Sequence, residues 1–145
     1  MHIVICNERL LFRFGLDRAL ILIGQRLHEA GHRVTVLVNR YDDDSVGEWA
    51  DQVRMIPEAA DYLCSNESAS DFLAARWEDW FSPEATPDLA IVGGWPFFSA
   101  IEQFEARGIA TLFLDCGAVP TEGLTGGSLL IQEKLRQMRR RHLPS

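Results

Sequence analysis

The sequence lacks the long apolar runs and leader features of membrane and exported proteins. No hydrophobic stretch approaches the roughly 18 residues that a membrane-spanning helix requires. The N-terminus has no basic segment ahead of an apolar core, and its first apolar run, residues 3–6, has only the length of a strand. The chain has 145 residues, of which 47% are hydrophobic and 24% charged. This is the composition of one globular domain with a sizeable core.

Cysteine is also scarce, and its three copies form neither a metal-binding nor a disulfide pattern. Cys6, Cys64 and Cys116 lie far apart, and no CxxC pair occurs. Cys6 and Cys116 each end an apolar run, which favours buried thiols. An odd number of isolated cysteines is typical of a reducing compartment, so we expect a cytoplasmic protein without a bound metal.

Positive charge is in deficit, since 14 Lys and Arg residues stand against 21 Asp and Glu residues, a formal charge of −7. This balance disfavours nucleic acid as the main partner. The charge is unevenly placed, because residues 131–145 carry a net +4 and the remainder therefore −11. The basic tail fits the C-terminal end of a helix, where cations are favoured. It also fits a contact with anionic lipid or with a second domain.

The glycine-rich phosphate motifs of common nucleotide-binding domains are missing. The chain contains no GxGxxG and no GxxxxGK[ST]. The loop after the first apolar run, "FRFGLDRAL" at residues 12–20, has a single glycine, which follows Cys6 only after eight residues. A dinucleotide site needs its glycines directly after the strand, so NAD and FAD are disfavoured.

What the chain does have is a regular alternation of apolar strand and amphipathic helix patterns. Continuous β-branched runs such as "VTVLV" predict strands that are buried on both faces. We expect strands over residues 2–6, 34–38, 53–56, 89–92 and 110–114. Helical spacing predicts helices over residues 16–30, 69–81, 96–107 and 128–141, the first of them ended by Gly31.

This order predicts an α/β fold, a Rossmann-like doubly wound sheet that is mainly parallel and has helices on both faces. Ligands of such folds bind beyond the carboxyl ends of the strands. Four loops are therefore candidates for the site: residues 7–15, 39–45, 93–96 and 115–127.

In the first loop, Gly15 lets the backbone approach a ligand, and the helix that begins at Leu16 offers free N–H groups. A turn glycine followed by Asp17 as an N-cap or first-turn acid explains the same residues without a ligand. Both interpretations remain open at this point.

The third and fourth loops carry the other candidates. Gly94 and its neighbouring glycine permit close backbone approach, and the flat face of Trp95 suits stacking on a sugar ring, or simply covers the sheet edge. Asp115 follows a buried strand, where a carboxylate can act as a general base, accept a sugar hydroxyl or order the next turn. Cys116 lies directly beside it.

Three elements together resemble the N-terminal domain of the retaining, family-4 type (group 1) glycosyltransferases of GT-B fold. They are "LHEAGHRVTV" at residues 27–36, "PDLAIVGGWP" at 87–96 and "ATLFLDCG" at 110–117. Their order and spacing carry the resemblance, which covers essentially the whole chain. The family loop usually has two glycines, whereas Leu16 follows Gly15 here.

The resemblance implies that residues 1–145 form a single acceptor-side domain, without the C-terminal domain that binds the donor. The implied reaction transfers a sugar from a nucleotide sugar, such as a UDP- or GDP-sugar, to a glycan, lipid-linked or small-molecule acceptor, without a cofactor or metal. Gly15, Leu16 and Asp17 would approach the sugar or diphosphate. The acceptor side would be lined by Gly94, Trp95 and Cys116, with Asp115 as the catalytic candidate.

Further expectations follow for the isolated chain. It should be inactive alone, and an apolar face meant for a second domain should promote self-association. Contact with the inner face of the membrane is also expected if the basic tail binds lipid. The alternative function is a stand-alone α/β module that binds a ligand or partner, or one subunit of a split transferase.

Overall fold

The computed structural model describes residues 1–56, 69–93, 97 and 100–114. Within them, five parallel strands form one sheet in the order β3-β2-β1-β4-β5. The strands are β1 (His2–Leu10), β2 (Arg33–Tyr41), β3 (Gln52–Met55), β4 (Leu89–Val92) and β5 (Ala110–Phe113).

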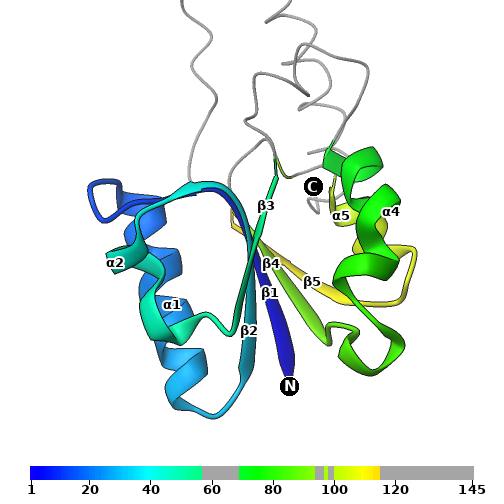
Figure 1. Cartoon of the computed structure of the whole chain (residues 1–145), viewed down its shortest axis with the longest axis horizontal. Helices are drawn as coiled ribbons and strands as arrows, with labels where there is room; N and C mark the ends of the chain where they lie inside the picture. Colours follow the sequence, from blue (N-terminus) through cyan, green and yellow to red (C-terminus); the bar gives the residue numbers. More distant parts are fainter. Residues whose placement is uncertain (57–68, 94–96, 98–99, 115–145) are drawn as a thin grey trace, which may run out of the picture.

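Helices cover both faces of this sheet. They are α1 (Gly15–Glu29), α2 (Asp43–Val46), α4 (Ala69–Trp80) and α5 (Ile101–Glu105), with short 3₁₀ helices η1 (Gly47–Trp49) and η2 (Pro83–Ala85). Figure 1 shows α1 and α2 on one face and α4 and α5 on the other. The predicted Rossmann-like α/β fold is therefore confirmed. Among the described residues, no helix has the length and apolar character needed to cross a membrane.

Two apolar cores lie on the two faces because successive side chains of a strand alternate. Ile3 and Ile5 of β1 pack with Leu20 and Ile21 of α1. Their neighbours Val4 and Cys6 face the opposite way, into a core that contains the aromatic side chains of α4 and α5. Both faces of β1 are thus apolar, which is why its sequence is a continuous hydrophobic run.

The strand order places a topological switch point between β1 and β4. The chain proceeds from β1 outward to β2 and β3, and then returns to add β4 and β5 on the other side of β1. Crossovers on opposite faces diverge at this point, which leaves room at the carboxyl ends of β1 and β4 for a ligand.

Several element boundaries differ from the sequence prediction. β1 and β2 extend to Leu10 and Tyr41, and these residues are paired across the two strands. The first loop is consequently short, residues 11–14, instead of 7–15. The helix expected over 96–107 is α-helical only at Ile101–Glu105 among the described residues, and the helix expected over 128–141 lies outside them.

Candidate functional site

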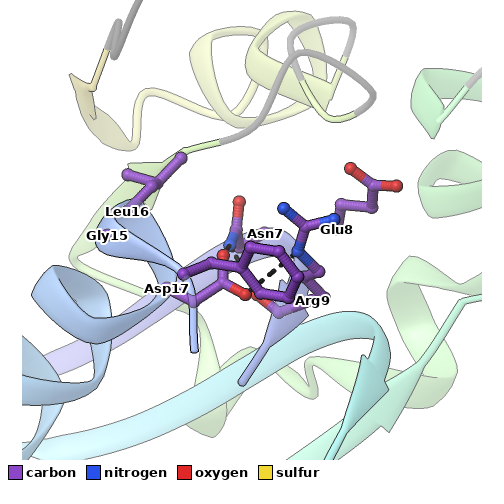
Figure 2. A pocket seen from close by; sticks show the side chains of 7 residues that line it. Asn7, Glu8, Arg9, Gly15, Leu16 and Asp17 are labelled. Atoms are coloured by element: carbon purple, nitrogen blue, oxygen red, sulfur yellow. Dashed lines mark hydrogen bonds and ion pairs between the residues drawn. The ribbon is translucent and has the colours of Figure 1, made fainter. Parts of the chain in front are cut away.

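A cavity of about 300 Å³ lies at the switch point, between the carboxyl end of β1 and the first turn of α1. Figure 2 shows its lining, with Leu16 and Glu8 on opposite sides and the side chains of Asn7, Arg9 and Asp17 between them. The full lining is Asn7, Glu8, Arg9, Phe14, Gly15, Leu16 and Asp17. All of these residues come from one contiguous segment, residues 7–17.

Asp17 organises this segment. Its carboxylate is almost fully buried, with 3% of the side chain exposed, and it accepts three hydrogen bonds. The donors are the Asn7 amide at 3.1 Å, the Arg9 Nε at 3.2 Å and the Leu11 backbone N–H at 3.2 Å. The carboxylate therefore ties the end of β1 to the start of α1 and fixes the path of the loop between them.

Burial raises the pKa of Asp17 above its ordinary value, since desolvation penalises the charged form. The Leu11 N–H, the Arg9 guanidinium and the Asn7 amide each favour the carboxylate and limit that rise. The three donors thus favour the ionised form of Asp17, against the effect of its burial.

Arg9 is fixed on two sides. Its Nε bonds Asp17, and its guanidinium lies over the Phe14 ring, 3.6 Å from the ring centroid. Such stacking is a favourable cation–π contact. In the described part of the chain, the two terminal nitrogens make no hydrogen bond, so the outer edge of the guanidinium is available at the cavity.

The first turn of α1 adds backbone donors. The helix begins after Phe14, which provides no side-chain cap, and its first backbone bond is from Arg18 N to Phe14 O. The N–H groups of Gly15 and Leu16 therefore have no partner among the described residues. A Cβ at Gly15 would meet no atom within 4 Å, so the glycine leaves open space there.

Three of the predicted site residues, Gly15, Leu16 and Asp17, are brought together in this cavity. Asp17 is a first-turn acid as expected, but it does not cap its helix, because Phe14 occupies the N-cap position. The binding role of the three residues stays a prediction. The other four predicted residues lie outside the described residues: Gly94, Trp95, Asp115 and Cys116.

No sequence motif identified Asn7, Glu8, Arg9 or Phe14 individually, although all four lie within the candidate loop at residues 7–15. Asn7, Glu8 and Arg9 belong to the part of β1 that extends beyond the expected strand at residues 2–6, and the apolar pattern does not reach them. One signal was present: Asn7 is the first polar residue after a buried run, at the end of a parallel strand where ligands bind. Among the described residues, no cluster of three His, Cys, Asp or Glu side chains could hold a metal ion.

The cavity can accept and donate hydrogen bonds and can hold an anionic group. Its donors are the Arg9 edge and the backbone N–H groups of Gly15 and Leu16. Its acceptors are the side-chain oxygens of Glu8 and Asn7. This lining suits a hydroxyl-rich polar ligand better than a flat apolar one.

Comparison with known proteins supports the fold assignment. No family model matches the sequence, and no match was found among curated proteins. Among solved structures, the chain is similar to a "Glycotransferase of kitacinnamycin", with a TM-score of 0.53 and 19% sequence identity. The alignment covers 97% of this chain and 36% of that protein, so the chain spans about a third of its length. The chain thus shares the Rossmann-like fold of one part of a glycosyltransferase.

Proposed function

We propose that this chain is the acceptor-side, N-terminal domain of a GT-B glycosyltransferase, which transfers a sugar from a nucleotide sugar to an acceptor hydroxyl with retention. The main support is the structural likeness, which runs through 97% of this chain but only 36% of a glycosyltransferase. This ratio is what one domain of a two-domain enzyme would give. The sequence elements at residues 27–36 and 87–96 support the same assignment.

The cavity supports a substrate role for the domain. It lies at the carboxyl ends of the strands, beside the switch point between β1 and β4, where ligands of doubly wound folds bind. The resemblance implies that Gly15, Leu16 and Asp17 approach the donor's sugar or diphosphate. Because Glu8 adds a negative charge to the same cavity, we assign the cavity to the acceptor instead, and a second domain holds most of the UDP- or GDP-sugar. Since leaving-group stabilisation requires donor contacts from that domain, residues 1–145 alone would not turn over. The proposed location is the cytoplasm, with peripheral contact at the inner membrane face.

The test compares the 145-residue chain with the product of the longer reading frame. If codons beyond Ser145 encode a second α/β domain, the longer protein is incubated with labelled UDP- and GDP-sugars and a panel of glycan acceptors. We expect sugar transfer by the longer protein and none by the 145-residue chain. Turnover by the short chain, or none by the longer protein with any donor, would contradict the proposal. A stop codon after Ser145 would favour a binding module or a split transferase.

A further inference from the structure

The side-chain amide of Asn7 has a fixed orientation, which follows from its hydrogen bonds. Its nitrogen lies within bonding distance of the Arg9 carbonyl oxygen and the Asp17 carboxylate, and both of these groups can only accept. The NH₂ group must therefore point at these two acceptors, which uses both of its protons. The amide oxygen is left on the opposite side, facing the cavity.

This oxygen receives no hydrogen bond from the described part of the chain. Asn7 as a whole is only 2% exposed, but its oxygen is not among the fully enclosed side-chain atoms that lack a partner. An accepting oxygen at the wall of a cavity can take a hydrogen bond from a ligand hydroxyl. Access to the oxygen depends on Gly93 at the end of β4. A Cβ at Gly93 would stand 3.4 Å from the Asn7 oxygen and 2.9 Å from Leu20 Cδ1.

The Arg9 side chain lines the same cavity as Asn7. Because Asp17 holds its Nε and Phe14 supports its plane, the two terminal nitrogens, which bond no described residue, form a preorganised fork. Such a fork matches the two oxygens of a carboxylate in a planar, bidentate pair. Glu8 lines the same cavity with a negative charge, which disfavours a dianionic group more than a monoanionic one.

We infer that the cavity recognises an acceptor that carries a carboxylate next to a hydroxyl, as in a sugar acid. Arg9 binds the carboxylate, and the Asn7 amide oxygen accepts the hydrogen bond of the neighbouring hydroxyl. This inference rests on the proposed acceptor-side function and names the chemical class of the acceptor. Asn7 and Arg9 are binding residues here, and neither is assigned a chemical step.

The test measures binding to the 145-residue chain by calorimetry and NMR shift mapping. The probes are glucuronate, its neutral counterpart glucose, glucose 6-phosphate, inorganic phosphate and UDP. We expect glucuronate to bind at least about tenfold more tightly than glucose, which is the factor that one charge-assisted pair supplies. Shifts should centre on Asn7, Arg9 and Gly15.

Two variants separate the two contacts. Arg9→Lys keeps the charge but loses the fork, so glucuronate binding should weaken about tenfold while glucose binding stays unchanged. Gly93→Ala obstructs the Asn7 oxygen and should weaken both sugars. Arg26→Lys is the matched control, since Arg26 is a surface arginine at the far end of α1 with 81% of its side chain exposed. The circular dichroism spectrum and Tm of each variant report whether it folds.

The other possible binding results contradict either the carboxylate inference or the acceptor-side function, as follows. Equal binding of glucose and glucuronate would reject the carboxylate inference and leave the acceptor-side function standing. Arg9-dependent binding of UDP or phosphate without glucuronate binding would assign the fork to the donor's phosphate. No binding of any sugar would contradict the acceptor-side function itself.

Discussion

At the scale of single residues, the Asp17–Arg9 pair decides the shape of the cavity. Burial raises the pKa of Asp17, so ionisation of this carboxyl opposes folding. A carboxyl group with a raised pKa stabilises the fold in its protonated form. This contribution is complete at a pH below the pKa of the group in the unfolded chain, and it is lost as the pH rises through the pKa in the folded state. The three donors around Asp17 reduce that loss.

We predict that Arg9→Met raises the pKa of Asp17 further, because the variant removes both a hydrogen bond and a positive charge. The variant should also lose about 1 kcal/mol more stability at pH 7 than at pH 4, because the Arg9 contact stabilises only the ionised form of Asp17 and a higher pH favours that form. Carbon-detected NMR titration of the Asp17 carboxyl and urea unfolding at both pH values measure these effects. Arg26→Met should change neither quantity. A pKa for Asp17 that falls or stays constant in Arg9→Met would contradict the prediction.

His2 is a second buried titratable group, located at the opposite end of β1. Its Nδ1 donates to the Ala85 carbonyl oxygen at 2.8 Å, and its Nε2 therefore accepts from the Thr35 hydroxyl at 2.8 Å. Burial lowers the pKa of His2, against the raising effect of the Ala85 carbonyl. The neutral ring is thus the form that the fold accommodates, and its role here is structural.

We predict a loss of stability as the pH falls below about 6.5, where the unfolded chain binds a proton that folded His2 resists. One such site changes the free energy of unfolding by at most about 1.4 kcal/mol per pH unit. Urea unfolding at pH 7.5 and 5.5 should show a smaller difference for His2→Gln than for the unmodified chain. The matched control is His32→Gln, which replaces a half-exposed histidine and keeps the buried His2 ring, so it should leave the difference intact. An identical pH dependence in His2→Gln would exclude His2 as its source.

At the scale of elements, α1 has a well-defined stop. Gly31 has a φ of +84°, and its N–H donates to His28 O at 2.9 Å while His32 N donates to Leu27 O at 3.0 Å. These two bonds form a Schellman motif, which needs a left-handed residue at the position of Gly31. The turn then directs the chain into β2.

We predict that Gly31→Ala lowers the free energy of unfolding by about 1 kcal/mol, because alanine resists the left-handed conformation. Gly15→Ala is the matched control at the other end of the same helix. Its φ is not positive and its Cβ would meet no neighbour, so it should leave stability unchanged or raise it by up to about 1 kcal/mol. Chemical unfolding of both variants measures the contrast, and equal effects would argue against the turn as the cause.

The elements also show what the sequence could predict. The five strands were predictable because their burial leaves short apolar runs in the sequence. The end of α1 was predictable because Gly31 is a typical helix-ending glycine. The polar end of β1 was not, since Asn7 and Arg9 form strand pairs for a tertiary reason: Asp17, eight to ten residues away, supplies the partners of their side chains. For the same reason the sequence indicated the cavity through Gly15 but did not identify the residues that provide its polar groups.

At the scale of the whole molecule, the helices among the described residues do not cover the two sides of the sheet equally. On the α1 face, the described helix contacts lie at β1 and β2, and the edge strand β5 presents Leu112 with 49% of the residue exposed. Its register partner on β4, Ile91, is only 3% exposed. An exposed leucine on an edge strand, beside a buried apolar neighbour, extends the core to the surface.

We predict that the 145-residue chain self-associates through this edge, with light scattering that gives a mass rising with protein concentration. Leu112→Gln should shift the association to higher concentration, because it removes apolar area from the contact. Leu22→Gln is the matched control: Leu22 is 51% exposed but lies on the outer surface of α1, where a single exposed leucine is ordinary. Scattering that stays monomeric at all concentrations would contradict self-association, and an equal effect of the two variants would contradict its assignment to β5. If the longer glycosyltransferase proposed above exists and stays monomeric while the short chain associates, the edge at Leu112 is covered by the rest of that enzyme.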